Sequence, residues 1–200
     1  MDKNLLTELY INGKKSSAEI AEIFGCSQHK VNYWINKQGI PKRSISEAIY
    51  QKRNPAGDPF NIKPVRNTVD AQFFGLGLGL YWGEGNKRNK HSIRLGNTDP
   101  LIIRKFTKFL VELLGVNKKR LRFGLQIFTD TPENAALHYW LKELKEFGIN
   151  RSQFFKPTIT PSGSIGTYKE KSKFGVMTVH FSNTKLKKIL DNMIAEVAQR

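Results

Sequence analysis

One segment, residues 70–87, limits the possible folds more than any other part of the sequence, and it reads DAQFFGLGLGLYWGEGNK. Its length and its apolar content predict a helix that begins near Asp70. Four glycines lie inside this helix, and each costs about 1 kcal/mol relative to alanine. Gly75, Gly79 and Gly83 are four residues apart and therefore share one face. That face predicts the close approach of a second helix, which can belong to a second copy of the chain.

The end of this helix carries a carboxylate, Glu84, and the next residue, Gly85, is expected as the first residue beyond the helix. A carboxylate there faces the negative end of the helix dipole, and Lys87, Arg88 or a bound cation would offset this effect. If two such helices pack side by side, their Glu84 carboxylates lie close together on a basic surface. The arrangement predicts a site for hard divalent cations with oxygen ligands, held between the protein and phosphate groups.

The nine residues GLGLYWGEG, residues 77–85, resemble the motif of the LAGLIDADG homing endonucleases. In this resemblance Gly79 corresponds to the helix-packing glycine, Glu84 to the metal-binding acid and Gly85 to the final glycine. The family implies an αββαββα fold in which the motif helices form a two-fold interface. Their acidic ends bind the Mg²⁺ ions that cleave DNA across the minor groove, while a saddle of β-strands reads the major groove. Because the chain has one copy of the motif, the resemblance implies a homodimer.

Residues 1–45 predict a small all-α helix-turn-helix domain. Ser16 and Glu19 have the spacing of a capping box, which starts a second helix that stops at Gly25. Ser27 can cap a third helix, which ends at Gly39. Two helices joined by this tight turn resemble the helix-turn-helix of many repressors and recombinases. The alternative is a three-helix unit that binds only other proteins.

The third helix of this domain is the expected DNA-reading helix. Asn and Gln side chains can form paired hydrogen bonds with adenine in the major groove. Lys42 and Arg43 follow the helix as an arm that is expected to contact phosphate or the minor groove. The positions of the helix predicted to face DNA are Gln28, His29, Lys30, Asn32, Tyr33 and Asn36.

A polar linker with several prolines, residues 46–69, precedes a second domain, residues 70–200. In this domain three strand-like runs pass into helices through polar capping residues, at 97–99, 129–131 and 182–184. The first and last of these pairs fit the αββαββα core. The middle pair, with its helix at about residues 133–147, is expected as an insertion. The predicted fold class is therefore α+β.

One predicted strand has a basic face opposite an apolar face. Arg120, Arg122 and Gly124 fall on one side, residues 121, 123 and 125 are apolar, and Gln126 continues the polar side. A strand of this kind is expected in a sheet that contacts DNA. Residues 156–175 predict a hairpin with a long basic loop, in which Lys171 and Lys173 contact phosphate. The alternative is a solvated hairpin tip.

The charge of the chain points to a polyanionic partner. Lys and Arg number 33 against 17 Asp and Glu, a formal net charge of +16. This excess favours nucleic acid, although a lysine-rich surface can also serve solubility alone. No apolar run approaches the roughly 20 residues of a membrane span, and the first residues lack a signal-peptide pattern. A single cysteine, Cys26, excludes a disulfide framework within the chain and fits a reducing compartment, so a cytoplasmic protein is expected. No motif for a small-molecule cofactor is evident, and none is expected.

Two functions follow from these features. The favoured hypothesis is a homodimeric, Mg²⁺-dependent, site-specific endonuclease of the homing type that acts on double-stranded DNA. In it Glu84 holds the metal, and Lys87 or Arg88 stabilises charge on the scissile phosphate. The alternative is a transcription regulator that uses the same LAGLIDADG-like scaffold to bind DNA without cleaving it.

Overall fold

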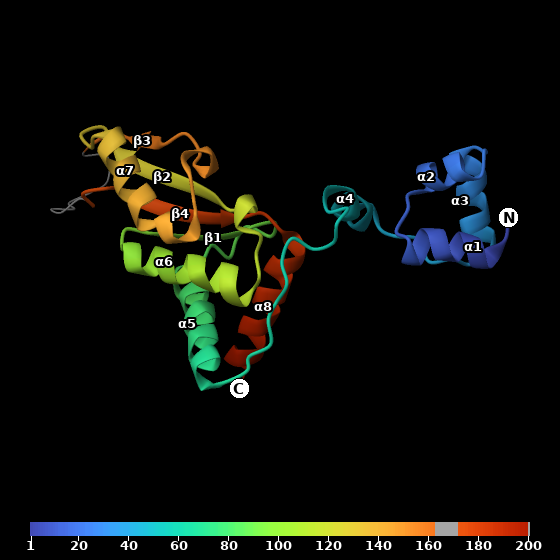
Figure 1. Ribbon diagram of the computed structural model, residues 1–200, viewed down its shortest axis with the longest axis horizontal. Coiled ribbons are helices and arrows are strands. Elements are labelled where there is room, and N and C mark those ends of the chain that lie inside the picture. The colour runs from blue at the N-terminus through green and yellow to red at the C-terminus, as the bar shows by residue number, and fades with distance from the viewer. Residues whose placement is uncertain (163–171, 200) are drawn as a thin grey trace. The chain divides into compact units, whose positions relative to one another are not determined.

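The computed structural model of the chain describes residues 1–162 and 172–199 (Figure 1). It divides into two compact units, Met1–Asp58 and Pro59–Arg200, here called the N-terminal unit and the larger unit. The described part of the N-terminal unit is helical, whereas the larger unit combines helices with a 4-stranded sheet. The predicted α+β class is therefore confirmed.

Local capping residues determine the helix boundaries of the N-terminal unit. Ser16 and Glu19 form the expected capping box, with Ser16 N–H donating to the Glu19 carboxylate at 2.7 Å, and Ser27 caps the next helix. Gly25 and Gly39 follow these helices with φ of 59° and 65°, values that glycine adopts without strain. The predicted boundaries are confirmed. The helical elements are α1 (Lys3–Thr7), η1 (Glu8–Asn12), α2 (Ser17–Ile23), α3 (Gln28–Lys37) and α4 (Ile45–Arg53).

The core of the N-terminal unit joins the first three helical segments. Ile20 of α2 and Val31 of α3 are fully buried, and Ala21 is small where α2 meets α3. Phe24, Cys26 and Trp34 pack against this core from its edge. The buried members of the core are Leu6, Tyr10, Ile20, Ala21, Val31, Ile35 and Ile40.

Arg43, which the sequence predicts to lie in an arm that contacts DNA, packs against other residues of the N-terminal unit. Its guanidinium lies 4.2 Å from the centre of the Tyr10 ring and donates to the carbonyl oxygens of Lys14, at 2.9 Å, and Lys15. It also donates to the side chain of Gln51, which belongs to α4. The stretch predicted as a linker, residues 46–69, thus contains most of a helix, because Ser44 and Glu47 form a second capping box.

The larger unit begins with extended chain and then a long helix. Phe60 and Ile62 pack against the core of this unit. Helix α5 starts at Thr68, before the predicted Asp70, because the Asn67 side chain accepts a hydrogen bond from the Asp70 N–H at 2.8 Å. The elements are α5 (Thr68–Glu84), β1 (Ile93–Asn97), α6 (Pro100–Lys108), η2 (Phe109–Leu113), η3 (Lys118–Arg120), β2 (Arg122–Phe128), α7 (Glu133–Glu143), η4 (Lys145–Phe147), η5 (Arg151–Gln153), β3 (Thr158–Thr160), β4 (Val176–Phe181) and α8 (Thr184–Ala198).

The sheet has the strand order β1-β4-β2-β3. Strand β4 is antiparallel to both β1 and β2, whereas β3 is parallel to β2. The predicted hairpin over residues 156–175 is therefore wrong, because β2 lies between β3 and β4. The chain before β3 lies along the outer edge of β2, where Phe154 forms a parallel bridge with Phe123. The two rings stack with their centroids 5.4 Å apart.

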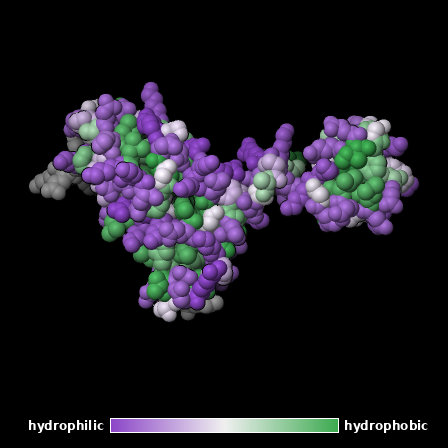
Figure 2. All heavy atoms as spheres, viewed as in Figure 1, coloured by the Kyte–Doolittle hydropathy of each residue, from purple (hydrophilic) through white to green (hydrophobic). Residues whose placement is uncertain are grey.

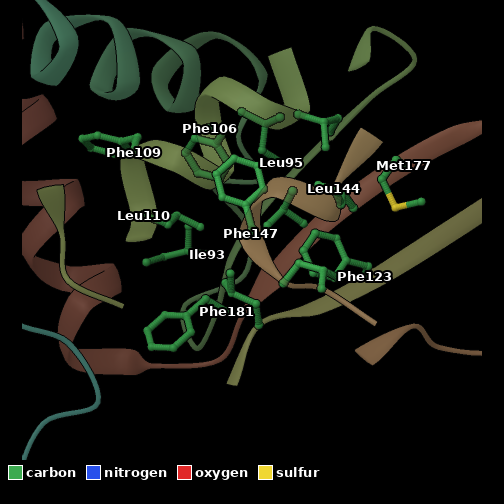
Figure 3. Packing of buried hydrophobic residues seen from close by; sticks show 14 of the residues in the cluster. Ile93, Leu95, Phe106, Phe109, Leu110, Phe123, Leu144, Phe147, Met177 and Phe181 are labelled. Carbon is green, nitrogen blue, oxygen red and sulfur yellow. The ribbon is translucent and has the colours of Figure 1, made fainter. Parts of the chain in front are cut away.

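One face of the sheet is buried under helices. Figure 1 shows α5, α6 and α8 together on one side of the sheet, and α7 contacts β2. Alternate residues of each long strand enter the common core, including Leu95, Phe123 and Met177. Figure 3 shows these side chains packed with Phe106 and Phe109, which follow each other along α6 and η2. Burial of apolar area on this scale is what holds the strands and helices together.

Helix α5 uses its glycines on two different faces. Gly77 is buried, and a Cβ atom at this position would collide with the ring of Phe109. Gly75, Gly79 and Gly83 are exposed, and a Cβ atom at each would meet nothing within 4 Å. Within the chain, therefore, Gly77 is the glycine that permits close helix packing, and the predicted glycine face is left uncovered.

Among the described residues, no helix combines the length and the apolar character needed to cross a membrane.

The two kinds of glycine predict opposite effects on stability. Gly77→Ala should lower the free energy of unfolding by about 1–3 kcal/mol, because the methyl group overpacks the core at Phe109. Gly79→Ala, in the same helix, should raise it by up to about 1 kcal/mol. Urea unfolding of dilute protein measures both changes, and equal destabilisation by the two variants would contradict the assignment of faces.

Candidate nucleic-acid interface

The face of the sheet opposite the core carries polar and basic side chains, and we call it the open face. On β2, Arg122 and Gln126 are exposed, whereas the alternating residues Phe123, Leu125 and Ile127 are buried. The alternation predicted for this strand is therefore confirmed. The exception is Arg120, which lies in the 3₁₀ turn η3 before the strand begins.

Three strands bring their basic side chains into one row. Arg94 of β1 pairs in register with His180 of β4, and His180 pairs in register with Arg122 of β2. We call these three residues the arginine row. The Arg94 side chain is oriented by a hydrogen bond from Nε to Ser92 Oγ at 2.8 Å. Arg122 donates to the carbonyl oxygens of Lys119 and Leu121, both at 2.8 Å.

The next row of the open face has almost no side chains. Gly96, Thr178 and Gly124 pair in register across β1, β4 and β2, and we call them the glycine row. A Cβ atom at Gly96 would lie 2.8 Å from Thr178 Oγ1, so a larger residue there would displace the threonine. Gly96 and Thr178 of this row line a hollow together with Arg94 and His180 of the arginine row.

Helix α5 delivers Glu84 to the same face. The residue after it, Gly85, has an extended backbone with φ −73° and ψ 147° and forms an antiparallel bridge with Leu95 of β1. Gly85 follows the helix as expected, but glycine is required there for a different reason than the usual one at a helix end, a positive φ. A Cβ atom at Gly85 would collide with the carbonyl oxygen and ring of Tyr81, so the position requires glycine because of a close approach. The N–H of Asn86 then donates to the Arg94 carbonyl at 2.8 Å.

These elements enclose a hollow of about 460 Å³ on the open face. Sequence reasoning identified Glu84 but missed its partners from β1 and β4. The period-two alternation in IRLGN and VMTVHF is the signal that could have found them. The residues that line the hollow are Glu84, Asn86, Arg94, Gly96, Thr178 and His180.

His180 has an unusual ionisation in this setting. Burial, followed by the positive charge of Arg94, lowers the pKa of the His180 imidazole to about 4. The ring is therefore neutral at neutral pH. The arginine row then carries two permanent positive charges on either side of an uncharged aromatic ring.

The basic residues near Glu84 have separate placements. Lys87 Nζ donates to the carbonyl oxygen of Trp82, which satisfies an acceptor at the end of α5 and offsets the negative end of the helix dipole. Arg88 is exposed in the turn that follows. Lys87 therefore contacts the end of helix α5, in addition to the contact with the scissile phosphate that the sequence predicts for it.

The remaining predicted contacts of the larger unit lie at the far side of the open face. Gln126 Nε2 donates to Thr160 Oγ1 of β3 at 3.1 Å. Lys173 is exposed before β4, with its ammonium group 5.4 Å from the centre of the Phe174 ring. Lys171 lies outside the described residues. The sheet thus brings Arg122 and Gln126 onto one surface, whereas Arg120 and Lys173 flank it.

The N-terminal unit exposes most of the predicted face of α3. Tyr33 is 55% exposed, and the ammonium group of Lys37 lies over the rings of Tyr33 and Trp34, 5.5 and 5.1 Å from their centres. Gln28 is held by a hydrogen bond to Ser17 Oγ at 2.9 Å. Asn32 is partly buried, and the other predicted positions, His29, Lys30, Asn36 and Lys42, are exposed.

Within one chain, Glu84 supplies the carboxylate in the lining of the hollow. Among the described residues, no three His, Cys, Asp or Glu side chains gather in a way that could hold a metal ion. The side-chain oxygens in the lining belong to Glu84, Asn86 and Thr178, and the amide oxygen of Asn86 also accepts a hydrogen bond from the Asn89 N–H at 3.1 Å. One chain therefore offers part of a ligand set for a hard cation.

No protein-family model matches the chain. No curated protein matches it either. Among solved structures, it is similar to the periplasmic domain of MotB from Helicobacter pylori, with 20% sequence identity and a TM-score of 0.29. The match covers 52% of this chain and 84% of the MotB chain. A similarity this weak carries no information about function.

The pKa of His180 predicts a pH dependence of stability. Between about pH 6.5 and 4 the unfolded chain binds a proton at His180 and the folded chain does not, so the free energy of unfolding should fall as the pH falls. His180→Gln should flatten this slope, whereas His138→Gln, at an exposed position of α7, should retain it. An NMR titration midpoint of the His180 ring near 6.5 would contradict the partly buried placement of the ring beside Arg94.

Proposed function

We propose that this chain binds double-stranded DNA in a sequence-specific manner, through the open face of its sheet and through helix α3. The observation that carries the proposal is the one-sided sheet, in which the arginine row crosses three strands in register on the exposed face. Phosphate contacts of this kind orient a protein on the duplex, and neighbouring polar side chains read the bases. Gln126 and Thr160, on the same surface, are suited to base contacts.

The charge of the molecule supports this choice of partner. A formal net charge of +16 disfavours the compact state by self-repulsion, and a polyanion relieves it. Release of counterions from DNA then contributes much of the binding free energy and makes it depend on salt. Duplex DNA is favoured over RNA because we take α2 and α3, separated by a short turn at Gly25, to act as a helix-turn-helix. A helix-turn-helix places its second helix in the major groove.

The resemblance to LAGLIDADG proteins extends the proposal to a homodimer. On α5 the exposed fraction is 71% for Val69, 46% for Leu76 and 48% for Trp82, and the uncovered glycine face lies on the same helix. Figure 2 shows hydrophobic residues at the surface of the larger unit where α5 lies. A second copy packed against this helix would cover them and bring two Glu84 residues together.

A second candidate function, Mg²⁺-dependent cleavage of the bound DNA, is favoured by the position of Glu84 in the hollow beside Arg94. Mg²⁺ keeps several waters and takes one or two carboxylates together with substrate phosphates, so Glu84 and Asn86 fit a partly hydrated ion. Such an ion would polarise a phosphate oxygen and activate a water molecule. Arg94 would hold the phosphate. The alternative is a transcription regulator that binds DNA through the same surfaces without cleavage.

The arginine row predicts a specific effect on DNA binding. Arg94→Ala and Arg122→Ala should each weaken binding and lower the slope of log affinity against log salt by about 1. Lys105→Ala, which removes the same charge from the exposed surface of α6, is the matched control and should leave the slope unchanged. Fluorescence anisotropy over a salt series measures this. Equal losses for all three variants would indicate general attraction with no defined surface.

Glu84 separates the endonuclease from the regulator. A plasmid library with randomised sites, incubated with Mg²⁺, should be cut at a defined sequence by the wild type and left intact by Glu84→Gln. The control Glu196→Gln, at an exposed position of α8, should cut like the wild type. If no variant cuts but the library is enriched for a bound sequence, the chain is a regulator.

A further inference from the structure

An exposed aromatic side chain stands at the edge of the open face and has no part in the functions proposed above. Phe155 is 49% exposed, although its N–H donates to the Phe123 carbonyl at 2.8 Å and so joins the edge of β2. Because Phe154 turns inward and stacks on Phe123, Phe155 turns to the open face. A single exposed phenylalanine would need no explanation, but this one has a ring partner.

Phe155 forms an aromatic pair with His180 beside Gly124. The ring centroids are 5.4 Å apart and the ring planes meet at 88°. A Cβ atom at Gly124 would lie 3.1 Å from His180 Nε2 and 3.9 Å from the Phe155 ring. The absence of a side chain at Gly124 therefore lets both rings lie close over the backbone of β2. His180 also lines the hollow, so the aromatic pair lies at its border.

The charges around this pair suit a nucleotide. Arg94 and Arg122 flank His180 on the neighbouring strands and can hold phosphates on both sides of the rings. Aromatic rings set among arginines are the usual means by which proteins bind unstacked bases.

We propose that Phe155 and His180 form a stacking site for one nucleobase displaced from the base stack of a bound DNA duplex. The inference rests on the proposed binding of DNA to the open face and adds that the duplex is distorted at one position. Displacing a base costs free energy, least where the base is already unpaired. A duplex that contains an unpaired base should therefore bind more tightly than the same duplex fully paired.

The test compares two short duplexes with the full chain at low salt. One duplex is fully paired, and the other carries 2-aminopurine as a single-nucleotide bulge. The bulged duplex should bind roughly 5- to 100-fold more tightly, and stacking should quench the 2-aminopurine fluorescence. Equal affinities without quenching would overturn this inference while leaving DNA binding intact. Failure to bind either duplex would overturn the proposed function as well.

Variants of the pair make the test specific. Phe155→Ala and Phe155→Leu should both remove the preference for the bulge, so that the two duplexes bind with equal affinity. The leucine variant keeps the apolar bulk and guards against a loss of folding. Ile159→Ala on β3, where the side chain is 53% exposed, is the matched control and should keep the preference. A preference that survives in Phe155→Leu would also overturn the inference.

Discussion

The apolar side chains on one face of the sheet must be removed from water, and the arrangement of the larger unit depends on this requirement. Strands β1, β2 and β4 each bury alternate residues against the helices, among them Ile93, Phe123 and Val179. Because side chains alternate along a strand, burial of one set sends the other set to the opposite face. The open face, with its arginines and glycines, is therefore a consequence of how the core is covered.

The candidate site combines this surface with the end of helix α5. Close packing of Gly77 on Phe109 holds helix α5 against η2. The bridge between Gly85 and Leu95 joins the end of α5 to β1, so Glu84 lies where the helix passes into the sheet. There the carboxylate lines the same hollow as Arg94 and a neutral His180. A site with one carboxylate, permanent cations and an aromatic ring is suited to a phosphodiester with its attached base.

Helix α5 also shows why a sequence pattern can have more than one structural use. The glycines at four-residue spacing and the apolar residues Leu76 and Trp82 remain uncovered within one chain. The helix thus packs on its own unit through one face and retains a second apolar face. This second face is the structural basis for proposing a second copy of the chain as partner.

The sequence by itself determined what depends on neighbouring residues. Capping pairs such as Ser16 and Glu19, the glycines at 25 and 39, the alternation along β2 and the α+β class were all predictable, because each is decided within a few residues. Only the tertiary structure decided which distant segments meet. It placed β3 beside β2, turned Arg43 toward Tyr10, and brought His180 between Arg94 and Arg122 and next to Phe155. These contacts join segments far apart in the chain, and their pairing follows from the shape of the shared core, which no local pattern encodes.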